Sequence, residues 1–172
     1  MPNPLFILRK SDEILSLYGQ RPKALSHYVR EKLACSDRTK ICDLASMMQR
    51  LIGCSISAEV VFFNDNGKEL YTEFPELVHS YLALADDGQG DLWMLRLADG
   101  MMVFFDHGKT EEPITPLGIN FQQFLQLADL IAQWEQFLNA NPDHAAAQEP
   151  ALWAEMKKIE PKLPKTYPFR LQ

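Results

Sequence analysis

Cysteine is scarce in this sequence. Its 172 residues include only three cysteines, Cys35, Cys42 and Cys54. An odd number at spacings of seven and twelve residues fits neither a disulfide framework nor a CxxC metal site. We therefore expect free thiols in a reducing compartment, and a cytoplasmic protein.

Long apolar runs are missing as well. No stretch of the chain approaches the roughly 18 consecutive apolar residues that a membrane-spanning helix needs. The first residues, MPNPLFILRKSDE, carry their charges after a short apolar run, whereas a signal peptide carries them before it. The sequence predicts neither a signal peptide nor a membrane partner.

Basic residues are rare in the middle of the chain. Lys and Arg against Asp and Glu number 9 against 5 in residues 1–50, 3 against 15 in residues 51–148, and 5 against 3 in residues 149–172. Nucleic-acid binding depends on Lys and Arg displacing counterions, so the acidic block argues against a nucleic-acid partner. Such a surface can steer a basic macromolecule into contact, or it can serve solubility alone.

Composition and length favour one folded domain. The chain is 47% hydrophobic and 23% charged, which is typical of a globular protein large enough to bury a core. We expect a domain over residues 1–142 and a C-terminal extension over residues 143–172. Because the extension is rich in proline and has a short helical pattern at Ala151–Ile159, we expect it to lie against the domain or a partner.

The apolar spacing predicts an α+β fold, with N-terminal helices, a central and mostly antiparallel sheet, a long C-terminal helix packed on the sheet, and an extended tail. The expected helices are Ser11–Tyr18, capped by Ser11, then Pro22 to about Cys35, and Thr39–Ile52. The expected strands are Glu59–Phe63, its return partner Lys68–Phe74, and His79–Ala85.

The clearest pattern is a hairpin of the strands DLWMLRL and MMVFF around the turn Ala98-Asp99-Gly100. Both faces of these strands are apolar, so we expect helices on one face and the tail or a partner on the other. Residues 107–118 hold two prolines and two glycines and are expected to form a loop. Asn120 is expected to cap the longest helix, which carries an apolar stripe from Phe124 to Leu138.

Catalytic motifs are absent. HExxH, His-x-His, the nucleophile elbow, GxGxxG and the P-loop do not occur, so we expect no enzyme and no cofactor. Asp106 and His107 are adjacent, and neighbouring strand residues point to opposite faces, so Asp106 cannot readily orient the imidazole. A small hydrolase-type enzyme would require both residues to converge in a pocket with Asp86, Asp87 or Asp91.

The acidic turn DDGQGD could also be considered as a metal site. An EF-hand loop needs acids at alternate positions over about twelve residues, and this turn spans only six. We therefore expect no metal here, and a solvated turn or a partner contact instead.

Residues 81–107 carry a family resemblance. The segment YLALADDGQGDLWMLRLADGMMVFF, the following Asp106-His107 and the phenylalanine-rich start of the helix at Asn120 resemble the central part of the SUKH superfamily. That superfamily includes yeast cell-wall assembly regulators and bacterial immunity proteins. The resemblance implies an α+β fold and a non-enzymatic role, commonly the neutralisation of a toxin, often a basic nuclease, by binding it.

The leading hypothesis is therefore a protein-binding module whose acidic surface captures a basic protein, such as a toxin domain. A regulatory or scaffolding protein of the same fold, with a cellular partner, remains an alternative, and a homodimer remains open. The expected partner-binding residues lie on turns at one edge of the hairpin. They are Asp86, Asp87, Asp91, Glu111 and Glu112, together with Asp106 and His107.

Overall fold

The structure, a computed structural model, describes residues 5–34, 43–64 and 74–169. Its helices are α1 (Ser11–Tyr18), α2 (His27–Ala34), α4 (Leu44–Leu51), α5 (Phe121–Ala140), α6 (Ala145–Ile159) and α7 (Leu163–Thr166), with 3-10 turns η2 (Pro75–Leu77) and η3 (Pro142–His144). Its strands are β1 (Ser55–Ser57), β2 (Val60–Phe62), β3 (Tyr81–Asp86), β4 (Leu92–Arg96), β5 (Met101–Phe105) and β6 (Ile114–Asn120). The predicted α+β class is confirmed.

The six strands form one antiparallel sheet in which each strand pairs with the next along the chain. The predicted β4–β5 hairpin is confirmed, with Leu92 opposite Phe105 and Leu95 opposite Met102. Its turn is closed by an Arg96–Asp99 ion pair of 2.6 Å. The β1–β2, β3–β4, β4–β5 and β5–β6 connections are short, whereas the β2–β3 connection runs from Phe62 to Tyr81 and contains η2.

The loop predicted over residues 107–118 is wrong in its second half, where β6 begins at Ile114. Pro116 lies opposite Val103, and Gly118 takes a left-handed backbone with φ 74°. β6 is an edge strand with one unpaired side, which tolerates a proline that has no N–H to donate. Because proline and glycine are typical of loops, the sequence pattern does not predict this strand.

The region around β2 differs from expectation in its pairing. β2 pairs with β1 on one side and β3 on the other. β1 is a three-residue strand that the sequence pattern does not predict. The strand predicted over Lys68–Phe74 lies outside the described residues, except for Phe74, which precedes η2.

The starts of the N-terminal helices differ from the predictions in different ways. Lys10, and not Ser11, is the N-cap residue of α1. Its backbone N–H donates to the Glu13 carboxylate at 2.7 Å. α2 begins at His27 instead of Pro22. α4 begins at Leu44 with Asp43 at its N-cap position, and residues 39–42 of the predicted helix lie outside the described ranges.

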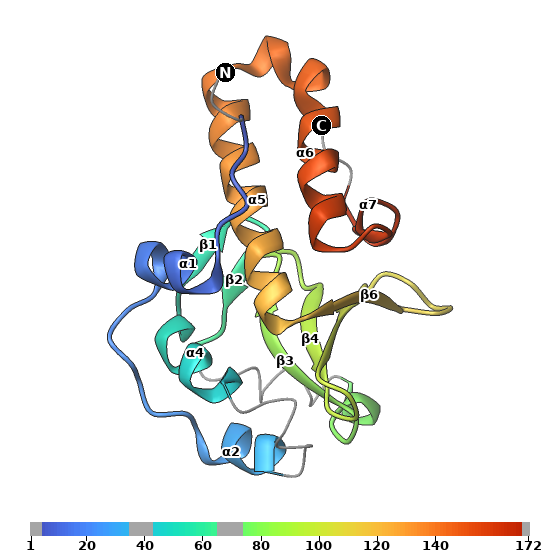
Figure 1. Cartoon of the computed structure of the whole chain (residues 1–172). Helices are drawn as coiled ribbons and strands as arrows, with labels where there is room; N and C mark the ends of the chain where they lie inside the picture. Colours follow the sequence, from blue (N-terminus) through green and yellow to red (C-terminus); the bar gives the residue numbers. More distant parts are fainter. Residues whose placement is uncertain (1–4, 35–42, 65–73, 170–172) are drawn as a thin grey trace.

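Most of the core lies between the sheet and α5, and the C-terminal segment packs on that same face (Figure 1). The Trp93 ring shows this, because it lies 5.2 Å from the Phe124 ring of α5 and 5.9 Å from the Phe169 ring of the tail. The expectation that the tail covers the opposite face is wrong. That face carries a smaller cluster of Leu77, Ala83, Leu92, Met94, Val103 and Phe105, packed with side chains that include Tyr28 and Phe74.

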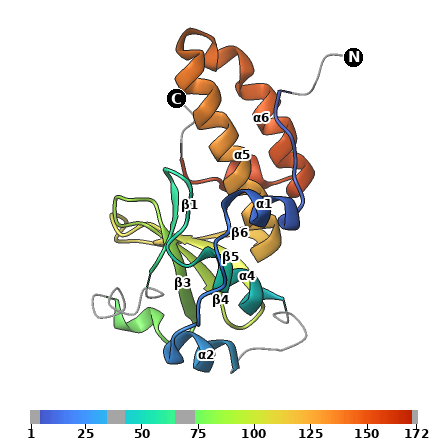
Figure 2. The ribbon, with the colours of Figure 1, turned by 90° about the vertical axis from the view of Figure 1, so that its left-hand side faces the viewer.

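Helix α5 begins with the predicted cap. Asn120 Oδ1 accepts from the Gln123 N–H at 3.0 Å, and the Gln123 side chain accepts from the Asn120 N–H at 3.0 Å. The first half of α5 covers the sheet, and the second half projects beyond it beside α6 (Figures 1 and 2). The helix is the element to which both ends of the chain attach.

Candidate protein-binding surface

Three connections meet at one end of the sheet. The β1–β2 turn holds Ala58 and Glu59, the β3–β4 turn spans residues 87–91, and the β5–β6 loop spans residues 106–113. Their closeness follows from the register, since Val61 lies opposite Asp86 and Leu92 lies opposite Phe105. In Figure 2 they lie together on the side away from α1. The structure thus brings all seven residues of the predicted site to this end of the sheet.

The β3–β4 turn is shaped by its own carboxylates. Asp86 Oδ1 accepts from the Gly88 N–H at 2.7 Å, and Asp87 Oδ1 accepts from the Gln89 and Asp91 N–H groups at 2.8 and 3.1 Å. Asp87 is buried, which the sequence does not indicate. Such side-chain to backbone bonds hold a turn in one conformation. The half-buried Asp86 and Asp91 are therefore held in fixed positions on this turn.

Asp91 and His107 join the two neighbouring connections. Asp91 Oδ1 lies 2.7 Å from His107 Nδ1 and also accepts from the His107 N–H at 2.9 Å. The hydrogen bond to Asp91 raises the pKa of His107 above its usual value. Sequence reasoning considers Asp106 as the partner of this imidazole, but the orienting carboxylate comes from sixteen residues earlier in the chain. The turn at Gly90 leaves room for the ring, because a Cβ there would lie 3.3 Å from His107 Cε1.

The β5–β6 loop carries the remaining predicted residues. Asp106 Oδ1 accepts from the Gly108 N–H at 3.0 Å, and its Oδ2 lies 3.3 Å from Lys109 Nζ. Glu111 and Glu112 are both exposed. Glu112 takes a left-handed backbone with φ 47°, the only positive φ for a residue other than glycine in the described part of the chain. Among the predicted carboxylates these two are exposed, whereas Asp86, Asp91 and Asp106 are half-buried and Asp87 is buried.

Two further carboxylates, Glu59 and Glu135, belong to this end and are missed by sequence reasoning. Glu59 accepts from the Tyr167 hydroxyl, and its backbone carbonyl accepts from Trp93 Nε1 at 2.6 Å. Glu135 reaches across from α5 to accept from the Ala58 N–H at 3.0 Å. Burial raises the pKa of both carboxyl groups above their usual values, and each glutamate lies too far along the chain from its partner for any local pattern to reveal it.

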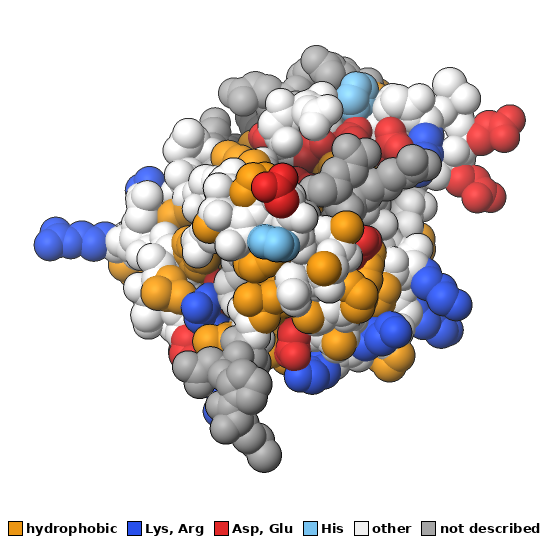
Figure 3. All heavy atoms as spheres, turned by 90° about the horizontal axis from the view of Figure 1, so that it is seen from above, with side chains coloured by type: hydrophobic (Ala, Val, Ile, Leu, Met, Phe, Trp, Pro, Cys, Tyr) orange, Lys and Arg blue, Asp and Glu red, His pale blue; other side chains and the backbone are white. Residues whose placement is uncertain are grey.

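The charge at this end is strongly of one sign. Residues 58–59, 86–91 and 106–113 contain seven acidic side chains and a single lysine, Lys109. In the view from the end where α5 and α6 project, acidic side chains gather toward one margin of the molecule and most basic ones lie elsewhere (Figure 3). We call these three segments the acidic end.

The catalytic hypothesis requires Asp106 and His107 to converge with Asp86, Asp87 or Asp91, and a metal site requires several ligands to lie together. Asp91 and His107 do come together, with side-chain exposures of 18% and 48%, but Asp106 bonds within its own loop. Within residues 5–34, 43–64 and 74–169, no group of three or more His, Cys, Asp or Glu side chains is placed to hold a metal ion.

Described residues also line cavities away from the acidic end. One, of about 390 Å³, lies between the first turns of α1 and α4, and another, of about 520 Å³, lies between α2 and η2. Cys54 is a buried free thiol, and Cys35 and Cys42 lie outside the described ranges. The Asp91–His107 contact joins two connections of the acidic end.

None of the helices that the structure describes is long and apolar enough to cross a membrane. No protein-family model, curated protein or solved structure matches the chain.

Proposed function

We propose that this chain is a non-enzymatic protein-binding module that captures a basic protein at its acidic end. The observation that carries the proposal is the convergence of three sheet connections bearing seven acidic residues against one lysine. Opposite charge across an interface speeds association and selects the partner. The partner we propose is a basic toxin domain of the nuclease kind, which the chain neutralises as an immunity protein.

The rigidity of the acidic end supports this role. Asp86, Asp87, Asp91 and Asp106 each accept backbone N–H groups, so their carboxylates are already oriented before any partner arrives. A surface that is ordered in advance loses less side-chain entropy on binding. The resemblance of residues 81–107 to the SUKH superfamily supports the same proposal, because immunity proteins are among its members.

The proposal is tested by reversing charge where no turn depends on it. Glu111 and Glu112 are exposed, so the double variant Glu111→Lys, Glu112→Lys changes the field without removing any of the turn hydrogen bonds described above. The matched control is Glu76→Lys, Asp143→Lys, which makes the same change of net charge at exposed positions away from the acidic end. A tagged chain first captures its partner from a lysate of its own cells, and the partner is identified by mass spectrometry.

The captured partner is then titrated against the wild type and both variants over a range of salt concentrations. We expect the variant at the acidic end to weaken binding at least tenfold and to flatten its salt dependence, because two attractive charges become repulsive. The control should lie close to the wild type. Equal loss in both variants would leave only a general effect of net charge and would contradict a specific acidic site. Capture of a cellular partner in place of a toxin would favour the regulatory alternative.

A further inference from the structure

His107 lies between two of the three segments that form the acidic end. It belongs to the β5–β6 loop, and its ring lies beside Gly90 of the β3–β4 turn, where a Cβ would be 3.3 Å from Cε1. The side chain is 48% exposed. It is the only histidine in the three segments, and histidine is the side chain whose charge ordinarily changes near neutral pH.

One carboxylate holds both the backbone and the ring of His107. Asp91 Oδ1 accepts from the His107 N–H at 2.9 Å and lies 2.7 Å from Nδ1. Because an ionised carboxylate only accepts, the neutral imidazole keeps its proton on Nδ1 and has a lone pair on Nε2. The neutral ring can therefore accept a hydrogen bond from a cation, and the protonated ring cannot.

The charged groups that act on this ring are carboxylates. The hydrogen bond to Asp91 raises the pKa of His107, and the charges of Asp91, Asp106 and Asp87 act in the same direction. Lys109, the one lysine of the three segments, is paired with Asp106 at 3.3 Å. A protonated His107 offsets the charge of Asp91, whereas a neutral His107 leaves that charge in the field of the acidic end.

A basic partner acts on the same group in the opposite direction. Lys and Arg side chains that approach the acidic end bring positive charge close to His107, and this disfavours the protonated imidazole. Binding of a cationic partner and binding of a proton at His107 therefore compete. By linkage, a partner that binds must release protons from the imidazoles that hold one.

We propose that capture at the acidic end is coupled to the loss of a proton from His107, so that a basic partner binds more tightly as the pH rises from about 6 to about 8.5. This inference rests on the proposed function and adds the regulation of its site. At the lower pH the imidazolium repels the partner and offsets Asp91. At the higher pH the neutral ring leaves Asp91 free to attract it.

The test uses an oligolysine peptide of about ten residues, whose amino groups keep their charge throughout this range. Isothermal titration calorimetry with the whole chain, at constant ionic strength and in buffers of different ionisation enthalpy, gives the affinity and the number of protons released. The variant His107→Gln cannot be protonated and keeps the backbone N–H that donates to Asp91. The matched control is His144→Gln, at an exposed histidine of η3.

We expect the wild type to bind the peptide at least about threefold more tightly at the upper pH than at the lower, and to release protons on binding near neutral pH. His107→Gln should lose most of both effects, and His144→Gln should keep them. Glu59 and Glu135 also have raised pKa values, but both chains contain them, so the difference between the wild type and His107→Gln isolates the imidazole.

Nuclear magnetic resonance supplies a direct check, because the ring signal of His107 should titrate at a lower pH when the peptide is bound. An unchanged midpoint would overturn the proposal. If Glu111→Lys, Glu112→Lys weakens binding but the wild type and His107→Gln share one pH dependence, capture at the acidic end stands and the role of His107 is overturned. If the peptide does not bind the wild type, or binds the charge-reversed chain as tightly, both are overturned.

Discussion

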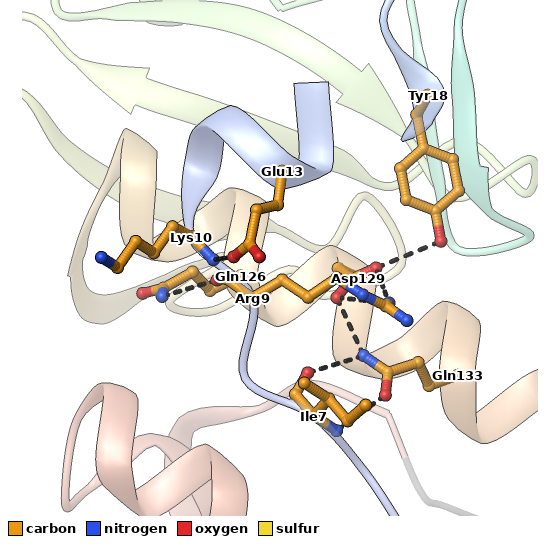
Figure 4. Close-up of polar contacts among 8 residues, drawn as sticks. All are labelled: Ile7, Arg9, Lys10, Glu13, Tyr18, Gln126, Asp129 and Gln133. Carbon is orange, nitrogen blue, oxygen red and sulfur yellow. Dashed lines mark hydrogen bonds and ion pairs between the residues drawn. The ribbon is translucent and has the colours of Figure 1, made fainter. Parts of the chain in front are cut away.

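The two ends of the chain attach near the same helix by different means. The N-terminal segment, residues 5–10, which we call the N-terminal strap, is held mainly by polar bonds that centre on the buried carboxylate of Asp129 (Figure 4), and Phe6 is its one buried side chain. The C-terminal segment, from α6 to Phe169, depends on apolar area, since Leu152, Met156 and Leu163 are fully buried against the core. A contact that depends on one ion pair is lost when one charged group is removed. A contact that depends on buried apolar area is shared among many side chains.

The electrostatics of the strap sharpen this difference. Burial raises the pKa of the Asp129 carboxyl above its usual value, and the Arg9 guanidinium acts in the opposite direction. A buried carboxylate is tolerable only while its partners remain in place. The attachment of the strap is therefore more sensitive to the loss of one charged group than that of the C-terminal segment.

The largest expected effect is at the C-terminal segment. Met156 is fully buried, so Met156→Ala removes its contacts and leaves a cavity, with a loss of about 4 kcal/mol in the free energy of unfolding. Urea unfolding followed by far-UV circular dichroism measures it. Ala154→Gly, at an exposed position of the same helix, is the control and should cost about 1 kcal/mol. A loss no larger than that of the control would mean that the segment does not pack as described.

Removing the charge that binds the strap should cost slightly less. Asp129→Asn keeps the shape of the side chain but leaves Arg9 without its anion, and we expect a loss of about 3 kcal/mol in the free energy of unfolding. The same urea titration measures it, with the exposed Asp143→Asn as the control.

A double variant separates charge from packing at the strap. Arg9→Met with Asp129→Leu replaces the whole ion pair by apolar side chains, and such replacements are close to neutral or stabilising. We therefore expect it to recover most of the stability that Asp129→Asn loses. A loss equal to that of the single variant would show that the bonds of Asp129 to Tyr18 and Gln133, which Leu cannot accept, matter as much as the ion pair with Arg9.

A smaller effect is expected from the one polar bond of the C-terminal segment. The buried Tyr167 hydroxyl donates to Glu59, so Tyr167→Phe removes this bond and keeps the ring, at a cost of about 1 kcal/mol in the free energy of unfolding. Phe169, whose ring lies 5.3 Å from that of Phe104, should stay in place. Loss of the Phe169 contacts, seen in nuclear Overhauser effects to Trp93, would show that this bond and not apolar area positions the segment.

Local patterns in the sequence predict part of this structure. The β4–β5 hairpin follows from the apolar strands and the turn at Asp99-Gly100, and α5 follows from the Asn120 cap and its apolar stripe. Both features depend on residues that are close along the chain. β6 is not predicted, because Pro116 and Gly118 are typical of loops. A strand at the edge of the sheet tolerates them, since one of its sides is unpaired.

The sites are harder to predict, because their contacts join distant residues. The acidic end is foreseen at its turns, since the turn acids are adjacent in sequence and the hairpin register brings them together. The Asp91–His107 pair and the reach of Glu135 to Ala58 depend on the folded sheet and helix. The contact of Arg9 with Asp129 spans 120 residues, and a lone arginine in an apolar N-terminal segment gives no signal of it.

The smallest expected effects concern alkaline pH, where both ends of the chain hold a tyrosine against a carboxylate. Burial, with the nearby Asp129, raises the pKa of Tyr18 to about 12, and burial raises the pKa of Tyr167 well above its usual value. The unfolded chain loses these protons near pH 10, while the folded chain keeps them. The folded state therefore binds more protons above pH 10, and the free energy of unfolding must fall as the pH rises from 10 to 12.

Tyr18→Phe and Tyr167→Phe each remove one of these contributions, so each should flatten the fall, measured by urea unfolding at several pH values between 9 and 12. Tyr167 is buried and Tyr18 is partly exposed, so solvent screening leaves the smaller share to Tyr18. A flatter profile in Tyr18→Phe than in Tyr167→Phe would reverse the comparison. It would mean that Tyr18, at the end of α1 and bonded to Asp129, is the more strongly desolvated of the two tyrosines.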